Sequence, residues 1–228
     1  MSLANYLRYQ RQATGTKIVC EEGDCGACTV LLGKPQGDQL AYQPVNSCIQ
    51  FLYQLDGTHV VTVEGLKVNG MLNPVQEAMV NCHGAQCGYC TPGFVVTMCA
   101  LFDPNLNPDS AEAKPGTACG SLTAQKVKDA LTGNLCRCTG YEPIIRAGLS
   151  VDSSQITPLD DLYPPAPMLA AYAGVQSESI LIETTPVDGN AAGRIFFGPV
   201  SVREAVAFKS KHPGTVIVSG GTDVGVVC

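Results

Sequence analysis

Eight of the twelve cysteines in this 228-residue chain fall into two sets of four, and their spacing constrains the fold more than any other feature. The first set reads C-x4-C-x2-C followed by a distant fourth cysteine, which is the plant-type spacing for a 2Fe–2S cluster. Its members are Cys20, Cys25, Cys28 and Cys48. The second set joins C-x2-C to C-x-C across a long insertion, and its members are Cys87, Cys90, Cys136 and Cys138. Two clusters in one chain indicate an electron relay.

A zinc ion is the alternative to an iron–sulfur cluster at both cysteine sets. Structural zinc sites usually pair two C-x2-4-C units, and C-x4-C-x2-C does not divide in that way. In the first loop, Gly23 and Gly26 let the backbone curl around a cluster without obstruction by a Cβ atom. The second set is less specific, because by its spacing alone zinc and a cluster are equally good interpretations.

The composition excludes several other classes of protein. A net charge of −6 argues against a nucleic-acid-binding surface, which would need a basic stripe. No apolar run approaches the length of a membrane span, and the N-terminus lacks a signal-peptide pattern. A secreted disulfide scaffold would be a shorter chain with little core, whereas 45% of these residues are hydrophobic. We therefore expect a cytoplasmic protein in which metal ligation contributes to folding.

The first 66 residues suggest a β-grasp ferredoxin fold. Residues 2–10 predict a short helix with one apolar face. Three strand-like runs follow at 29–32, 42–45 and 60–63, and polar stretches such as 33–38 predict the turns between them. A helix, a metal loop and short strands in this order suit the β-grasp.

Residues 67–150 predict four helices instead, most of them with a capping signal. The first helix is expected to start at Asn73-Pro74, where Gln76 completes a capping box, and the second at Thr91-Pro92, running to Phe102. The third is expected to be capped by Thr123 and to run to Thr132, where Gly133 ends it. The fourth is a short helix over 143–149. The second cysteine set would then lie on loops at helix ends, where backbone N–H groups attract an anionic cluster.

The rest of the chain predicts a linker over 151–192 and the beginning of a further domain over 193–228. The linker is rich in Pro, Ser, Asp and Ala without a sustained period. In the last segment, Ser201 and Glu204 form a capping box for a helix to Lys211. A buried strand is expected over 215–218, running into a glycine turn.

Four motifs carry a resemblance to a known family. EGDCGACTV at 22–30, GAQCGYCTPGF at 84–94 and NLCRCTGYEPI at 134–144 resemble the iron–sulfur portion of the molybdenum hydroxylases, the xanthine dehydrogenase and aldehyde oxidase family. TVIVSGGTDVG, which begins at Thr215, resembles the first flavin-contacting strand and turn of that family's FAD domain. Together they resemble the iron–sulfur and FAD small subunit of bacterial-type xanthine dehydrogenase.

The resemblance implies an α+β fold in three parts: a β-grasp 2Fe–2S ferredoxin-like domain, a four-helix 2Fe–2S domain and the start of an α+β FAD-binding domain. The first cysteine set would hold the cluster nearer the flavin, and the second the cluster nearer molybdopterin on a partner chain. Gln86 and Cys138 would reach the pterin. The FAD pyrophosphate would be approached by Gly220, Gly221, Thr222 and Asp223.

The implied function is electron transfer without a catalytic residue in this chain. A molybdopterin-binding catalytic subunit would oxidise hypoxanthine or xanthine, as in purine catabolism, and electrons would pass through both clusters to FAD and then to NAD. We expect a hetero-oligomer. We expect the N-terminal hairpin of the β-grasp to be missing and the FAD site to be incomplete, as in a fragment or one piece of a larger assembly.

Three alternatives stay open. The chain could be the electron-transfer subunit of another molybdenum hydroxylase, acting on aldehydes, nicotinate or aromatic thioesters. It could be a zinc-stabilised interaction module without a redox role, or a fragment that never assembles its clusters. Outside both sets, Cys99 is expected to be a buried small hydrophobe, and Cys82 and His83 are expected not to be ligands. Cys119 and Cys228 also lie outside the sets.

Overall fold

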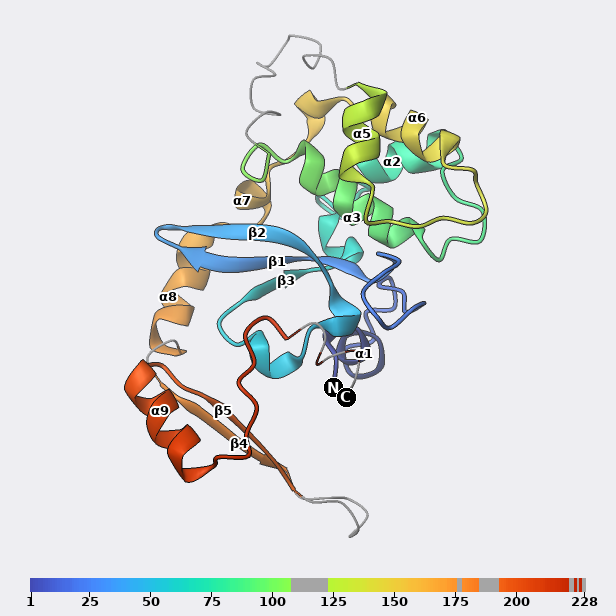
Figure 1. The fold of residues 1–228 in the computed structure, drawn as a ribbon. Coiled ribbons are helices and arrows are strands. Elements are labelled where there is room, and N and C mark those ends of the chain that lie inside the picture. The colour runs from blue at the N-terminus through green and yellow to red at the C-terminus, as the bar shows by residue number, and fades with distance from the viewer. Residues whose placement is uncertain (108–122, 176–177, 185–192, 222–223, 225, 227–228) are drawn as a thin grey trace.

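The computed structural model describes residues 1–107, 123–175, 178–184, 193–221, 224 and 226. Its N-terminal part holds a three-stranded antiparallel sheet with the order β2-β1-β3 (Figure 1). The strands are β1 (Thr29–Gln36), β2 (Gln39–Asn46) and β3 (His59–Val61). Each overlaps a predicted strand-like run, although β3 ends at Val61 instead of residue 63.

The strands β1 and β2 are longer than the sequence predicts, because 33–36 continues the strand instead of forming a turn. Gly33 lies opposite Tyr42, whose ring occupies the space that a Cβ at residue 33 would need. The true turn is the two-residue pair Gly37-Asp38, with φ of 66° at Gly37. Glycine at the first central position is typical of hairpin turns that match the strand twist.

The expected N-terminal helix is present, as the short helix α1 (Leu3–Asn5) continued by the π-helical turn η1 (Tyr6–Gln10). Leu3 and Leu7 are buried against Val30 of β1. This packing places the N-terminal segment beside the cysteine loop that precedes β1. Figure 1 shows α1 at one end of the sheet.

The helical block consists of α2 (Pro74–Asn81), α3 (Thr91–Phe102), α5 (Ala124–Ala130) and α6 (Glu142–Ser150). Asn73 caps α2 in the predicted capping box with Gln76, and Thr123 caps α5. Two details of the prediction are wrong. The N-cap of α3 is Cys90, so Thr91 lies inside the first turn. The helix α5 ends at Ala130 with Leu131 as its C-cap, before Gly133 is reached.

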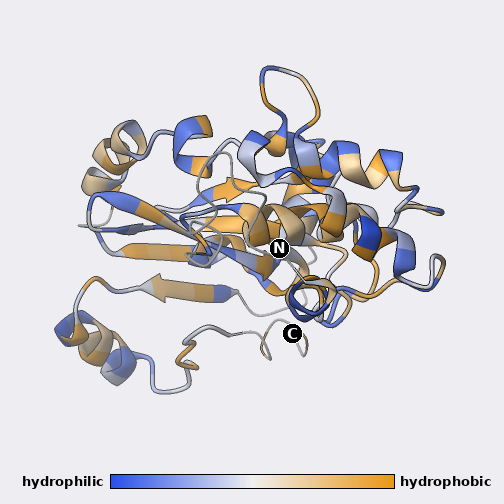
Figure 2. Ribbon diagram, turned by 90° about the horizontal axis from the view of Figure 1, so that it is seen from above, coloured by the Kyte–Doolittle hydropathy of each residue, from blue (hydrophilic) through white to orange (hydrophobic). Residues whose placement is uncertain are grey.

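One continuous core joins the sheet to the helices. Leu31 of β1, Leu40 of β2 and Val61 of β3 belong to the same buried cluster as Phe94 of α3 and Ile144 of α6. In Figure 2, hydrophobic segments of strands and helices meet near the centre of the molecule. The sheet and the helical block therefore stabilise each other instead of forming separate cores.

The segment 151–192 is not a plain linker. It contains the turn η5 (Ser153–Gln155), the helices α7 (Leu159–Leu162) and α8 (Pro165–Val175), and the strand β4 (Ile180–Thr184). Asp103 at the end of α3 holds α7 in place, since its carboxylate accepts the N–H of Leu159 at 2.8 Å. The hydroxyl of Tyr163 donates to the carbonyl of Gly65 at 2.8 Å. These bonds fix the segment against both cysteine-bearing units.

The last unit pairs β4 with β5 (Arg194–Gly198) and continues into α9 (Val202–Lys211). Ser201 caps α9 as predicted, by accepting the N–H of Glu204. Because β4 belongs to this sheet, the expected boundary at residue 193 is too late. The expected buried strand over 215–218 is absent from the described residues, and Val216 and Ile217 are 77% and 80% exposed. No helix in the described part of the chain could span a membrane.

Candidate metal centres

The first cysteine set converges at the end of the sheet beside α1. Cys20, Cys25 and Cys28 lie in the loop before β1, and Cys48 lies in the turn η2 (Ser47–Ile49) that follows β2. Cys28 and Cys48 are buried, while Cys20 and Cys25 are partly exposed. The thiols meet in two pairs, Cys20 with Cys25 and Cys28 with Cys48. The structure therefore brings together the four residues that the spacing selected.

In the buried pair of this set, Cys28 and Cys48, one sulfur is favoured as a thiolate. A hydrogen bond from the thiol of Cys48 lowers the pKa of Cys28 to about 6, with burial opposing the change. The backbone N–H of Cys48 also donates to the Cys28 sulfur at 3.4 Å. The same pairing raises the pKa of Cys48. The pairing thus favours the thiolate at Cys28, and the thiolate is the form that binds metal.

Backbone N–H groups of the loop point at these sulfurs. Although burial raises it, the pKa of Cys20 is lowered on balance by backbone hydrogen bonds, first from Glu22 and then from Cys25 and Asp24. Gly23 and Gly26 adopt φ of 80° and 69°, the left-handed conformation that glycine reaches without strain. The prediction that these glycines turn the loop is confirmed.

The second set lies on two loops at helix ends. Cys87 precedes α3 and Cys90 caps it, while Cys136 and Cys138 lie between α5 and α6. The sulfurs of Cys87 and Cys138 are 3.5 Å apart, and Cys90 is hydrogen-bonded to Cys136. The first of these pairs is exposed, whereas Cys136 is buried and Cys90 is half-buried. One edge of this site therefore faces outward.

Local hydrogen bonds again act on the thiols. Burial raises the pKa of Cys90 to about 12, with the Cys136 side chain as the next cause. For Cys136 burial also raises the pKa, but hydrogen bonds from the side chain and backbone of Thr139 lower it on balance. The hydroxyl of Thr139 lies 3.2 Å from the Cys136 sulfur. Thr139 is a site residue that the sequence did not single out.

The arrangement in pairs fits a two-iron cluster. Each iron of a 2Fe–2S cluster takes two protein ligands, so two thiol pairs supply one complete site. No group of three or more His, Cys, Asp or Glu side chains in the described part of the chain surrounds one point as a single metal ion requires. The two pairs of each set would hold such a cluster, and backbone N–H groups would stabilise the negative charge of its sulfurs.

The two sites are joined by direct hydrogen bonds. The N–H of Leu135 donates to the carbonyl of Cys25 at 2.9 Å, and the side-chain amide of Asn134 donates to the carbonyl of Gly26 at 3.1 Å. A Cβ at Gly93 would collide with the Gly26 carbonyl, so glycine in the first turn of α3 permits this close approach. The sequence pattern did not predict this role of Asn134, because its hydrogen-bond partner lies in a distant segment.

The other expected residues fall outside the thiol pairs. Gln86 is exposed on the loop that carries Cys87. Cys99 is buried, accepts a hydrogen bond from Asn73 at 3.4 Å and has its pKa raised by burial to about 12, so the prediction of a buried non-ligand agrees with the structure. The sulfur of Cys82 lies 3.5 Å from the hydroxyl of Ser150, and His83 is an exposed loop residue.

The glycine turn expected at a flavin is only partly described. Gly220 and Gly221 have φ of 81° and 73°, as such a turn requires. Thr222 and Asp223 lie outside the described residues, as do Cys119 and Cys228. The amide of Gln54 donates to the carbonyl of Gly220 at 3.0 Å, which places the turn beside the segment that follows Cys48.

Residues 62–149 match the family described as 2Fe-2S binding domain. Among curated proteins, aldehyde oxidase 1 of Macaca fascicularis is 31% identical over 98% of this chain and 18% of its own length. Xanthine dehydrogenase 1 of Arabidopsis thaliana is 41% identical over 64% of this chain and 10% of its own length. The chain therefore spans less than a fifth of these relatives.

Two solved structures of oxidoreductases are also similar to this chain. Quinoline 2-oxidoreductase from Pseudomonas putida 86 is 35% identical, with a TM-score of 0.53, over 76% of this chain and 85% of the matched chain. Aldehyde oxidoreductase from Desulfovibrio gigas is 26% identical, with a TM-score of 0.53, over 81% of this chain and 22% of its own.

Proposed function

The chain belongs to the molybdenum hydroxylase family, and from this premise we propose that it relays electrons from molybdopterin on a partner chain through two 2Fe–2S clusters to FAD. The eight paired cysteines would hold the clusters. When bound, each cluster supplies one-electron transfer, which splits a two-electron oxidation into single steps.

The observation that carries this proposal is the hydrogen bond from Leu135 to Cys25. Cys25 belongs to the first thiol set, and Leu135 directly precedes Cys136 of the second set. A single hydrogen bond thus links the backbone of a proposed ligand of the first cluster to the residue next to a proposed ligand of the second. Such proximity serves a relay, whereas two unrelated structural metal sites would have no need of it.

The exposure of the thiols supports an order for the relay. Cys87 and Cys138 are exposed, so the second site is open towards a partner that carries molybdopterin. At the other end, the bond from Gln54 to Gly220 places the glycine turn next to the unit of the first site. We therefore propose that electrons pass from molybdopterin to the second site, then to the first site, and then to FAD.

The assignment of FAD rests on the motif and on this turn. Gly220 and Gly221 would approach the pyrophosphate, together with Thr222 and Asp223 outside the described residues. Val216 and Ile217 are exposed in the segment that would form the flavin-contacting strand. This chain would therefore supply only part of a flavin site, and NAD would be the acceptor beyond it.

For the whole enzyme, we propose the oxidation of hypoxanthine and xanthine by a molybdopterin-binding catalytic subunit in a cytoplasmic hetero-oligomer. Aldehyde oxidases and a xanthine dehydrogenase are both among the relatives, so aldehyde oxidation is the second candidate. The substrate-binding residues would lie on the molybdopterin chain, and substrate turnover by the purified complex decides between the two.

Iron, zinc and acid-labile sulfide per chain, measured on protein purified without oxygen, test the relay itself. About four irons and four sulfides are expected for two 2Fe–2S clusters, with visible absorbance that dithionite bleaches. Half of each would mean that one site does not assemble. Zinc without sulfide would overturn the proposal in favour of a zinc-stabilised interaction module.

A further inference from the structure

The hydroxyl of Thr139 lies beside a buried sulfur of the second thiol set. Its oxygen is 3.2 Å from the sulfur of Cys136. Cys136 is 8% exposed, whereas Cys87 and Cys138 are exposed. Water can therefore stabilise negative charge on the two outer sulfurs but hardly on Cys136, which depends on donors from the protein. A hydrogen bond made away from water is also electrostatically stronger.

Two further hydrogen bonds decide which way the Thr139 hydroxyl donates. The backbone N–H of Tyr141 donates to the Thr139 oxygen at 3.1 Å. The backbone N–H of Cys136 donates to the hydroxyl of Tyr141, also at 3.1 Å, which closes a small ring of bonds around the sulfur. Because the Thr139 oxygen serves Tyr141 as an acceptor, its single proton is left for another partner. A metal-bound thiolate can only accept, so Thr139 is the donor to Cys136.

Tyr141 is held in a strained conformation that maintains this arrangement. Its φ of 69° lies in the left-handed region, which is uncommon for a residue with a bulky side chain. Its ring contacts that of Phe94 edge-on, with the centroids 6.3 Å apart, and Phe94 is fully buried. This contact and the bond from Cys136 oppose relaxation of the backbone and keep the N–H of Tyr141 on Thr139. Strain of this kind is typical of functional sites.

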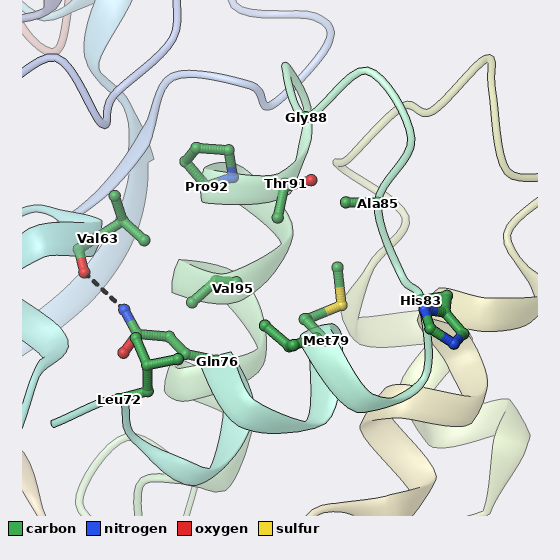
Figure 3. Close-up of a pocket in the computed structure, with 11 residues that line it drawn as sticks. Val63, Leu72, Gln76, Met79, His83, Ala85, Gly88, Thr91, Pro92 and Val95 are labelled. Atoms are coloured by element: carbon green, nitrogen blue, oxygen red, sulfur yellow. Dashed lines mark hydrogen bonds between the residues drawn. The ribbon is translucent and has the colours of Figure 1, made fainter.

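A second threonine follows a cysteine of this set, but its hydroxyl does not act on a thiol. Thr91 follows Cys90 as Thr139 follows Cys138. The Thr91 oxygen is buried and has no hydrogen-bond partner among the described residues. Figure 3 shows it at the start of α3, pointing towards Ala85. A place next to a ligand in the sequence is therefore not sufficient, and the conformation of the loop brings Thr139 to a sulfur.

We propose that Thr139 raises the reduction potential of the second 2Fe–2S cluster by donating a hydrogen bond to the Cys136 thiolate, with Tyr141 as the positioning residue. The inference rests on the proposed function and adds to it a residue that sets the driving force of one electron transfer. Reduction adds one electron, supplied in the relay by the molybdopterin chain, to a group that is already negative. A donor to its sulfur therefore stabilises the reduced form more than the oxidised form.

The test titrates the cluster-loaded chain with dithionite and follows each cluster by electron paramagnetic resonance, which gives two midpoint potentials. Thr139→Val removes the hydroxyl while keeping the shape, and the equilibrium constant for reduction of the second cluster should fall about tenfold, or about 59 mV for one electron. Thr139→Ser restores the hydroxyl and should return the potential towards the wild-type value. Thr91→Val is the matched control and should shift neither potential. The signal that Cys136→Ser removes is the signal of the second cluster.

The sign of the shift separates this role from a merely structural one. A loosened loop would admit water, which favours the more negative reduced form and raises the potential, whereas loss of the donor lowers it. An upward shift, an equal shift of both signals or no shift in Thr139→Val would overturn the proposal while the relay stands.

Iron content shows whether each variant assembles its clusters. If Thr139→Val does not load the second site, Thr139→Ala removes the same hydroxyl without adding bulk. Failure of both to load would show that the hydroxyl serves assembly instead of the potential, and would overturn the proposal. If the wild-type chain itself assembles no clusters, the proposed function fails and this inference with it.

Discussion

The side-chain amide of Asn134 donates a hydrogen bond to the carbonyl oxygen of Gly26, which lies 108 residues earlier in the chain, across 3.1 Å. Asn134 is 4% exposed, so this bond is made out of contact with water. Together with the bond from Leu135 to Cys25, it holds the loops of the two thiol sets together. The distance between the two sites is therefore a property of a few buried contacts.

Removal of the Asn134 amide should loosen this junction. Asn134→Ala leaves the Gly26 carbonyl without its side-chain donor, and a loss of about 1–3 kcal/mol in the free energy of unfolding is expected. Thermal unfolding of the cluster-loaded chain measures it. Asn81→Ala, at an exposed position at the end of α2, is the control and should change stability little. Equal effects of the two substitutions would contradict a structural role for the Asn134 bond.

A methyl group at residue 93 should separate α3 from the first cysteine loop. A Cβ there meets the carbonyl of Gly26 at a distance that no real contact allows, so Gly93→Ala must displace one of the two backbones. We expect lower stability and reduced iron content at both sites. Gly174→Ala in α8 is the control, because nothing lies within 4 Å of its added Cβ. That variant should keep its full iron content.

Substitution of a single ligand should distinguish the two sites. Cys136→Ser is expected to abolish the second cluster and leave the first, so that half of the iron and one of two electron paramagnetic resonance signals remain. Loss of both signals would mean that the shared core cannot form without the second cluster. Cys99→Ser should retain both signals, because the Cys99 sulfur accepts a hydrogen bond from Asn73 and pairs with no thiol among the described residues.

His59 should make the stability of the chain fall in acid. Burial lowers the pKa of His59, whose ring accepts or donates a hydrogen bond with Tyr42 at 2.7 Å and lies against Tyr163. The unfolded state, with a pKa of about 6.5, then binds the proton more readily than the folded state. The stabilisation by neutral His59 is present above that value and is lost as the pH falls below it.

Chemical unfolding at a series of pH values between 7 and 5 measures this effect as a difference between variants. His59→Asn keeps an amide for Tyr42 but cannot be protonated, so its stability should fall less in acid than that of the wild type. His83→Asn, at an exposed loop residue, should follow the wild type. Identical pH profiles for all three proteins would show that His59 does not contribute.

The sequence by itself determined the features that depend on nearby residues. The capping box of Asn73 and Gln76, the cap of α9 at Ser201 and the glycine turn of the first loop all appear as predicted, because each is made within a few residues. The spacing of the cysteines also selected the eight thiols, but only Cys20 and Cys25 meet within one loop. The other three pairs join distant segments, so the tertiary structure brings them together.

The tertiary structure decided what depends on distant partners. Pairing with β2 extends β1 to Gln36, and packing buries the Thr91 hydroxyl inside the first turn of α3, where it has no hydrogen-bond partner among the described residues and does not cap the helix. The apolar run from Thr215 to Val218 favours a strand locally, but no described strand pairs with it, so it does not form one. A strand needs a neighbour and a junction such as that of Asn134 with Gly26 needs two loops far apart in sequence, so neither can be predicted from local pattern.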